Sequence, residues 1–216
     1  HLGCQDAVAD LVENRSYQIR FAQNAPVISK RWHETSASVF LVHDKRVVAT
    51  DIKDLSNTDE AVERLVKIAK TSQPNKDYAG IARGRFKYAR VRPDPKILAL
   101  EDGRKFVEAA IGGALEMGAE ECAGSFWRYE DEHSLVTSNG AEGHDHRASL
   151  YLSIRAMTSL ESSGHGIACA TKMSQFEPEK AGRKAGRIAA LAKDPKPGKA
   201  GRYTIVFDPL IFGSLT

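Results

Sequence analysis

A stretch of alternating side chains in the second half of the chain constrains the fold most strongly. Its apolar members are separated by polar residues and are Ala148, Leu150, Leu152, Ile154 and Ala156. A period of two places all of them on one face, so this stretch predicts a strand that is buried on one side. Asn139-Gly140 lies just before it and favours a turn, because both residues tolerate positive φ. The surrounding chain must then supply pairing strands and a layer that covers the apolar face.

The rest of the second half supplies both. We expect strands at 122–129, 134–138, 164–171 and 203–207, with Glu130-Asp131-Glu132 joining the first two. The apolar spacing predicts helices at 102–117 and 178–193. Gly112-Gly113 lowers the intrinsic helicity of the first helix, which is explained if a sheet packs close to it. Gly182 and Gly186 lie four residues apart and allow close packing against another helix or a partner chain.

The first half follows a similar plan. Leu2, Val8, Leu11 and Val12 suggest a helix that ends near Asn14, and 17–21 then alternates as a strand. Residues 36–42 and 46–52 are predicted as a hairpin, followed by a helix over 59–71. The basic, irregular segment 77–95 is expected to link the two halves. The chain is thus predicted to be α+β, with antiparallel sheets packed against helices in two similar halves, 1–95 and 96–216.

Charge and cysteine content narrow the class of protein. The 216 residues carry 31 basic and 28 acidic side chains, a balance too even to imply a nucleic-acid or membrane partner. The three cysteines are widely spaced, so neither a disulfide framework nor a cysteine zinc site is expected, which fits a reducing cytoplasm. No apolar run approaches the roughly 20 residues that cross a bilayer. We expect a cytoplasmic protein without a membrane partner.

One cluster of metal-ligand residue types occurs in the sequence. His144 and His146 flank Asp145, and in a strand they would point to the same face, as two ligands of one metal do. A third ligand would have to come from elsewhere, such as His133 or His165. The alternative, which we favour, is a solvated loop between two strands, because two histidines rarely make a closed site.

One basic run is interleaved with aromatic residues. It comprises Arg83, Arg85, Lys87, Arg90 and Arg92, with Phe86 and Tyr88 between them. Cations for phosphates and rings for bases are typical of nucleic-acid binding. We favour the alternative of a charged linker or protected edge strand, because the rest of the chain is nearly neutral, and we do not expect a nucleic-acid partner.

Several segments together resemble the N-terminal region of a known family. In chain order they are ETSASVFLV, DLSNTDEAVERLVKIAK, SLVTSNGAE, the helix that begins PEKAGRKAG, and PGKAGRYTIVFDP. They look like the TldD/PmbA family of zinc metallopeptidases, also called modulators of DNA gyrase. The resemblance implies a complete protein that binds zinc, cuts unfolded or modified peptides, and acts as a homodimer or as a heterodimer with a related subunit.

One departure from the family pattern limits what the chain can do by itself. The family's zinc motif, His-Glu-x-x-x-His, follows the segment that ends at Pro209, and the chain stops at Thr216. The single His-Glu pair, His33-Glu34, has no second histidine one helical turn later. We therefore expect a substrate-cleft and dimerisation domain that is inactive alone, binds no cofactor itself and has no catalytic residue. The alternative is a non-catalytic peptide- or nucleic-acid-binding module or partner subunit.

Overall fold

The computed structural model describes residues 3–84 and 86–215, and its centre is one antiparallel sheet. The sheet has six strands in the order β3-β2-β1-β4-β5-β6, and every neighbouring pair is antiparallel. The strands are β1 (Asp6–Ala22), β2 (Ala25–His43), β3 (Arg46–Ile52), β4 (Glu121–Thr137), β5 (Glu142–Ser159) and β6 (Ser162–Ala170). The α-helices are α1 (Thr58–Thr71), α2 (Pro95–Leu98), α3 (Arg104–Glu116), α4 (Pro178–Leu191) and α5 (Pro209–Leu215). The predicted α+β class is confirmed.

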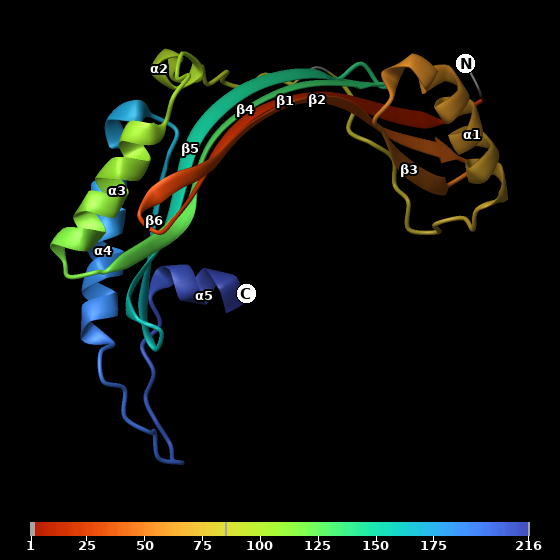
Figure 1. The fold of residues 1–216 in the computed structure, drawn as a ribbon. Helices are drawn as coiled ribbons and strands as arrows, with labels where there is room; N and C mark the ends of the chain where they lie inside the picture. Colours follow the sequence, from red (N-terminus) through yellow and green to blue (C-terminus); the bar gives the residue numbers. More distant parts are fainter. Residues whose placement is uncertain (1–2, 85, 216) are drawn as a thin grey trace.

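The sheet bends into an arch; α1, α3 and α4 cover the two ends of its outer face, and α5 lies below the arch, on the inner side (Figure 1). Helices α3 and α4 pack on the β4–β6 end, whereas α1 packs on the β2–β3 end. Each half of the chain thus contributes three strands and a helical layer, although all six strands join in one sheet. The domain boundary at residue 95 stays a prediction.

Two separate apolar clusters hold the helices on the convex face. The larger one lies under α3 and α4 and includes Ile19, Phe126 and the predicted alternating residues of β5, all nearly inaccessible to solvent. The smaller one joins Val39 and Leu41 of β2 to Leu65 of α1. The apolar face predicted for 148–156 is therefore confirmed, because it supplies the floor of the larger cluster.

The helix expected from Leu2 to Asn14 is wrong, and Leu2 itself lies outside the described residues. Residues 6–22 form β1, which pairs with β2 on one side and β4 on the other. Val8 and Val12 point to the concave face of this strand, whereas Leu11 points to the convex face. The spacing of the apolar residues fits a helix locally, but two complete ladders of backbone hydrogen bonds override this weak local preference.

Two other strand predictions also differ from the structure. Residues 122–129 and 134–137 belong to one continuous strand, which pairs with β1 and β5 without a break, and Ser138 lies just beyond its end. Glu130 and Glu132 lie within this strand, where they contact Arg15 of β1 and His144 of β5. Residues 203–207 alternate in sequence, yet they have no regular secondary structure and remain exposed. No described strand lies beside them, so the alternation has no pairing partner.

Glycines let α4 fit between β6 and α3. Cβ atoms at Gly164 and Gly166 of β6 would overlap the carbonyl oxygens of Ala185 and Ala181 in α4. On the other side of α4, Cβ atoms at Gly182 and Gly186 would overlap the carbonyl oxygens of Ala110 and Ala114 in α3. The close helix packing expected for Gly182 and Gly186 is confirmed.

The expectation for the glycine pair in α3 is wrong. A Cβ at Gly113 would lie 2.5 Å from the Glu179 carbonyl oxygen, so a helix and not a sheet approaches it. Gly112 faces open space, with nothing within 4 Å of an added Cβ. Two adjacent glycines of one helix thus have different roles, and only Gly113 is required by packing.

This difference gives a matched test of the α3–α4 contact. We expect Gly182→Ala to lower the free energy of unfolding by about 1–3 kcal/mol, because its methyl group meets backbone that cannot move independently. Gly112→Ala should instead raise it by about 0.5–1 kcal/mol through better helix propensity. Urea denaturation measures both, and equal stability of wild type and Gly182→Ala would contradict the packing argument.

Candidate functional site

The segment between α1 and α2 connects the start of β1 to the outer edge of β5. The Tyr88 hydroxyl accepts a hydrogen bond from the His144 backbone N–H at 2.6 Å and donates one to the His144 carbonyl oxygen at 3.0 Å. Earlier in the segment, the Tyr78 hydroxyl donates to Asp6 at 2.7 Å. Burial, and then this hydrogen bond, raise the pKa of Tyr78 to about 12, so its phenol stays neutral. The segment is therefore fixed at two tyrosines.

His144 and His146 lie on β5 and share the convex face, as expected for alternate residues of a strand. The His144 Nε2 atom lies 3.6 Å from Glu132, and the His146 Nε2 atom lies 3.2 Å from Glu130. His133 points to the concave face, where it contacts Asp10 at 3.1 Å, so it cannot complete a site with this pair. Among the described residues, no group of three or more His, Cys, Asp or Glu side chains is placed to hold a metal ion.

The basic run lies beside the histidine pair at the outer edge of β5. Arg83, Lys87, Arg90 and Arg92 are exposed, and none forms an ion pair with a described carboxylate, whereas Arg85 lies outside the described residues. Phe86 and Tyr88 are also about half exposed. The structure thus places the two features that the sequence singled out, the histidine pair and the basic run, side by side.

A hollow of about 720 Å³ lies where these features meet. Arg92, His146 and Lys172 contribute to its wall, together with Asp94. The backbone N–H groups of Met173 and Lys96 bind the Asp94 carboxylate and lower its pKa, so it is ionised at neutral pH. Because β6 pairs with β5 only from Leu150 onward, the outer edge of β5 beside the hollow has no described strand partner.

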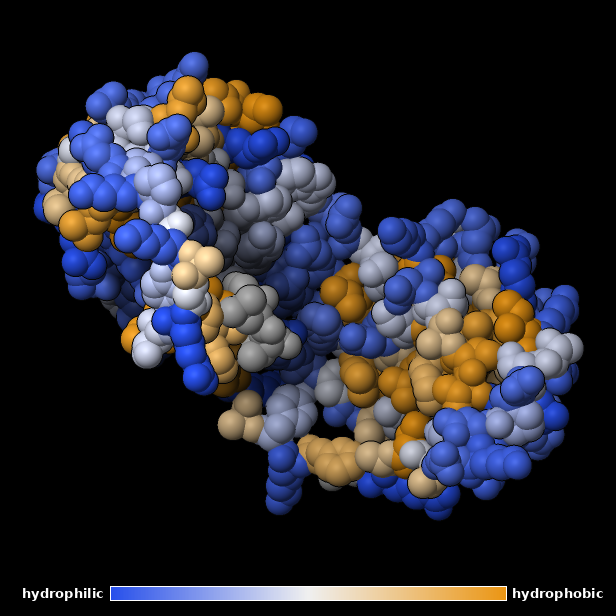
Figure 2. Space-filling view, turned by 90° about the horizontal axis from the view of Figure 1, so that it is seen from below, coloured by the Kyte–Doolittle hydropathy of each residue, from blue (hydrophilic) through white to orange (hydrophobic). Residues whose placement is uncertain are grey.

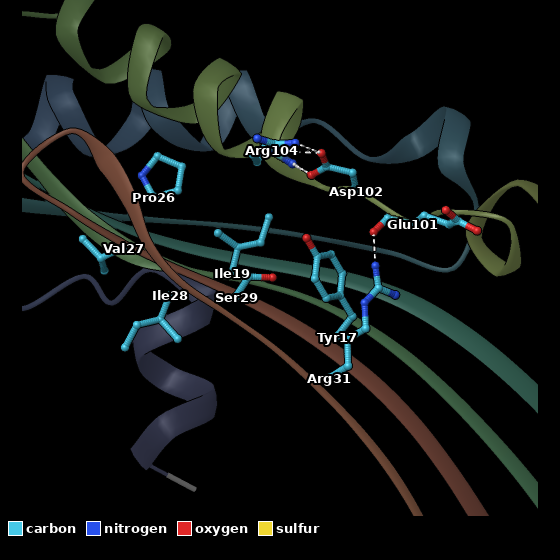
Figure 3. Close-up of a pocket in the computed structure, with 10 residues that line it drawn as sticks. All are labelled: Tyr17, Ile19, Pro26, Val27, Ile28, Ser29, Arg31, Glu101, Asp102 and Arg104. Atoms are coloured by element: carbon cyan, nitrogen blue, oxygen red, sulfur yellow. Dashed lines mark hydrogen bonds and ion pairs between the residues drawn. The ribbon is translucent and has the colours of Figure 1, made fainter.

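A second hollow, of about 490 Å³, lies between the start of β2 and the loop before α3 (Figure 3). Its floor is apolar and includes Ile19 and Val27. The Arg31 guanidinium stacks 4.4 Å from the Tyr17 ring centre and donates to the Glu101 carbonyl oxygen. Nearby, a side-chain hydrogen bond from Arg104 lowers the pKa of Asp102. Sequence reasoning missed this hollow, because its walls come from segments about 70 residues apart.

The concave face carries a row of aromatic rings, whereas α1, α3 and α4 all pack on the other face. Trp32 of β2 stacks on Trp127 of β4 with ring centres 5.5 Å apart, and Trp127 stacks on Tyr129 at 5.2 Å. Tyr151 of β5 lies directly opposite Trp127 in the ladder. Seen from below, this surface is hollowed between the two ends of the arch (Figure 2).

Comparisons with known proteins match most of the chain. Residues 7–71 match the model of PmbA/TldA metallopeptidase domain 1, and residues 93–193 match that of the PmbA/TldA metallopeptidase central domain. No curated protein matches the chain. No helix among the described residues is long and apolar enough to cross a membrane.

Solved structures with the same fold have low sequence identity to the chain. A candidate modulator of DNA gyrase from Bacteroides thetaiotaomicron is 20% identical, with a TM-score of 0.81 over 99% of this chain and 52% of that one. A similar protein from Thermotoga maritima is 14% identical with a TM-score of 0.71, and TldE from Thermococcus kodakarensis is 15% identical with a TM-score of 0.72. Each of the last two aligns over 91% of this chain and 46% of its own. The chain therefore spans about half the length of these structures.

The contact between Tyr88 and His144 can be tested directly. We expect Tyr88→Phe to speed amide hydrogen exchange at His144 by about fivefold, because two hydrogen bonds to its backbone are lost. Lys87→Ala is the matched control, since it changes the neighbouring exposed side chain and leaves the phenol in place. Unchanged exchange in Tyr88→Phe would show that the segment is held by other contacts.

Proposed function

Because the chain belongs to the PmbA/TldA metallopeptidase family, we propose that it forms the substrate-cleft and dimerisation part of a zinc metallopeptidase. The complete enzyme would act on unfolded or modified peptides, as a homodimer or as a heterodimer with a related subunit. The two matched domains are consecutive, and the relatives of known structure are about twice as long. Both facts support a catalytic half that follows this one.

The open concave face is the observation that carries the cleft proposal. The row formed by Trp32, Trp127, Tyr129 and Tyr151 is only partly buried, although aromatic rings are usually covered in a folded domain. Large, rigid rings give contact area at little entropic cost, which suits side chains of many shapes. An unfolded peptide exposes such apolar side chains, so it is the class of substrate that this surface fits.

The C-terminal segment supports contact with a further half. Tyr203, Ile205, Val206 and Phe207 are each 47–93% exposed, and Phe212 of α5 is 58% exposed. Contiguous exposed apolar side chains usually mark an interaction surface. We propose that this segment packs against the catalytic half.

Zinc does not fit the described residues of this chain. His144 and His146 already contact carboxylates, and no third ligand completes the set. The 216 residues also hold no His-Glu-x-x-x-His motif. We therefore assign the metal, the catalytic residues and every chemical step to the following half.

One observation favours a second candidate function. The exposed cations Arg83, Lys87, Arg90 and Arg92 lie beside aromatic rings, as they would in a binding module for nucleic acid or acidic peptides. Such binding to a single-stranded oligonucleotide would weaken steeply as salt is raised. Absent or salt-insensitive binding would remove this candidate.

If the metal ligands belong to the following half, the chain alone should lack the catalytic metal. We expect less than one zinc per chain by elemental analysis and no chelator-sensitive cleavage of an unfolded peptide. The double variant His144→Ala/His146→Ala is the control, and its metal content should equal that of wild type. Stoichiometric zinc that this variant loses, or peptide cleavage that a chelator stops, would overturn the proposal.

The cleft can be tested through the intrinsic fluorescence of the chain. Its two tryptophans both lie on the concave face, so the tryptophan signal reports on that surface alone. We expect a tryptophan-free, unstructured peptide rich in Phe and Leu to shift the emission, and Trp127→Ala to weaken its affinity by about tenfold. Tyr203→Ala, which removes an exposed ring elsewhere, should bind like wild type. Equal affinities for all three proteins would place the peptide on another surface.

A further inference from the structure

The outer edge of β2 is long, exposed and unpaired. β3 pairs with β2 only from Ala37 to His43, so residues 25–36 have β1 on one side and no described strand on the other. An open edge of this length is a template for another strand, and natural proteins usually block or cover it. The charges on this edge indicate what covers it.

The direction of the backbone groups follows from the hydrogen-bonding pattern of the sheet. The Ser138 N–H donates to the Ala7 carbonyl oxygen at 2.9 Å, so odd-numbered residues of β1 bond toward β4 and even-numbered ones toward β2. Even-numbered residues of β2 pair with even-numbered residues of β1 and therefore bond inward. Ser29, Arg31, His33 and Thr35 consequently direct their N–H and C=O groups outward, where they can bind an added strand.

The side chains along this edge are arranged symmetrically about Trp32. Lys30 and Glu34 flank it at equal spacing, and all three point to the concave face. Lys30 and Glu34 are exposed, and neither pairs with an opposite charge among the described residues. When two copies of this edge run antiparallel about Trp32, the cation of each copy therefore lies opposite the anion of the other.

We propose that a second copy of this chain pairs antiparallel along β2, with a two-fold axis at Trp32. This interface rests on the dimerisation role proposed above and gives it a position. Lys30 would lie opposite the second copy's Glu34, and Glu34 opposite the second copy's Lys30. The two Trp32 side chains would meet at a non-hydrogen-bonded position, where cross-strand side chains are closest. Such an isologous contact closes on itself and leaves the β2 edge of neither copy open.

The two ends of the open edge lie at about equal distances from Trp32, as pairing centred on this residue requires. Pro26 cannot donate a backbone hydrogen bond, and the partner position of Ala37 is occupied by Ile52 of β3. The stretch from Ser29 to Thr35 lies between these limits and has Trp32 at its centre. The two sheets would join into one, and the concave aromatic rows would meet at the dimer axis.

Charge reversal tests this interface with the 216-residue chain in sedimentation velocity experiments. We expect wild type to dimerise at micromolar concentration, and Lys30→Glu and Glu34→Lys each to raise the dimer dissociation constant by about tenfold or more, because like charges then face each other. An equimolar mixture of the two single variants should recover the dimer, since both ion pairs re-form between different chains. The double variant Lys30→Glu/Glu34→Lys should also dimerise.

Controls separate this inference from the rest of the proposed function. At protein concentrations well below the dimer dissociation constant, thermal melts should show similar stability for wild type and the charge variants, because both side chains are exposed in the monomer. Ser29→Pro removes an outward N–H without touching the β1 ladder, and we expect it to weaken the dimer as well. A monomeric wild type would overturn both this interface and the dimerisation role. A dimer that none of the variants changes would overturn this interface alone, and neither result bears on the zinc and peptide tests.

Discussion

The close approach of backbone to backbone around α4 is the contact on which the arrangement of the molecule depends. Glycines on β6, α4 and α3 remove the side chains that would separate these three elements. One helix can then sit directly on the sheet edge while a second helix packs against it. Both helices therefore cover the convex face at the β4–β6 end, and the aromatic row lies on the opposite face.

Long strands connect the two ends of the molecule. β1, β2, β4 and β5 are 17–19 residues long, well beyond the usual strand. β1 contributes to both apolar clusters, with Ala7 at one end and Ile19 and Phe21 at the other. Between the clusters the convex face is polar, and Glu130 contacts Arg15, Arg128 and His146 there. The irregular segment between α1 and α2 brings Arg92 to the same hollow as His146.

The site shows where prediction from sequence ends. That His144 and His146 share a face follows from the period of a strand, and so does their separation from His133 once the strands pair. Their contact with the basic segment joins residues 56 positions apart through Tyr88, and no local pattern encodes it. The hollow beside Arg31 and the aromatic row likewise depend on register between distant strands, which a single sequence does not report.

The sequence by itself determined the α+β class, the buried face of 148–156, the helices at 59–71 and 178–193, and the family resemblance. Each depends on periodicity or motif order, which are local properties of the chain. Only the tertiary structure decided that 6–22 is a strand, that 122–137 is uninterrupted, and which faces of the sheet are covered. Strand pairing satisfies backbone groups with partners far away in sequence, so these choices depend on contacts that local side-chain patterns cannot specify.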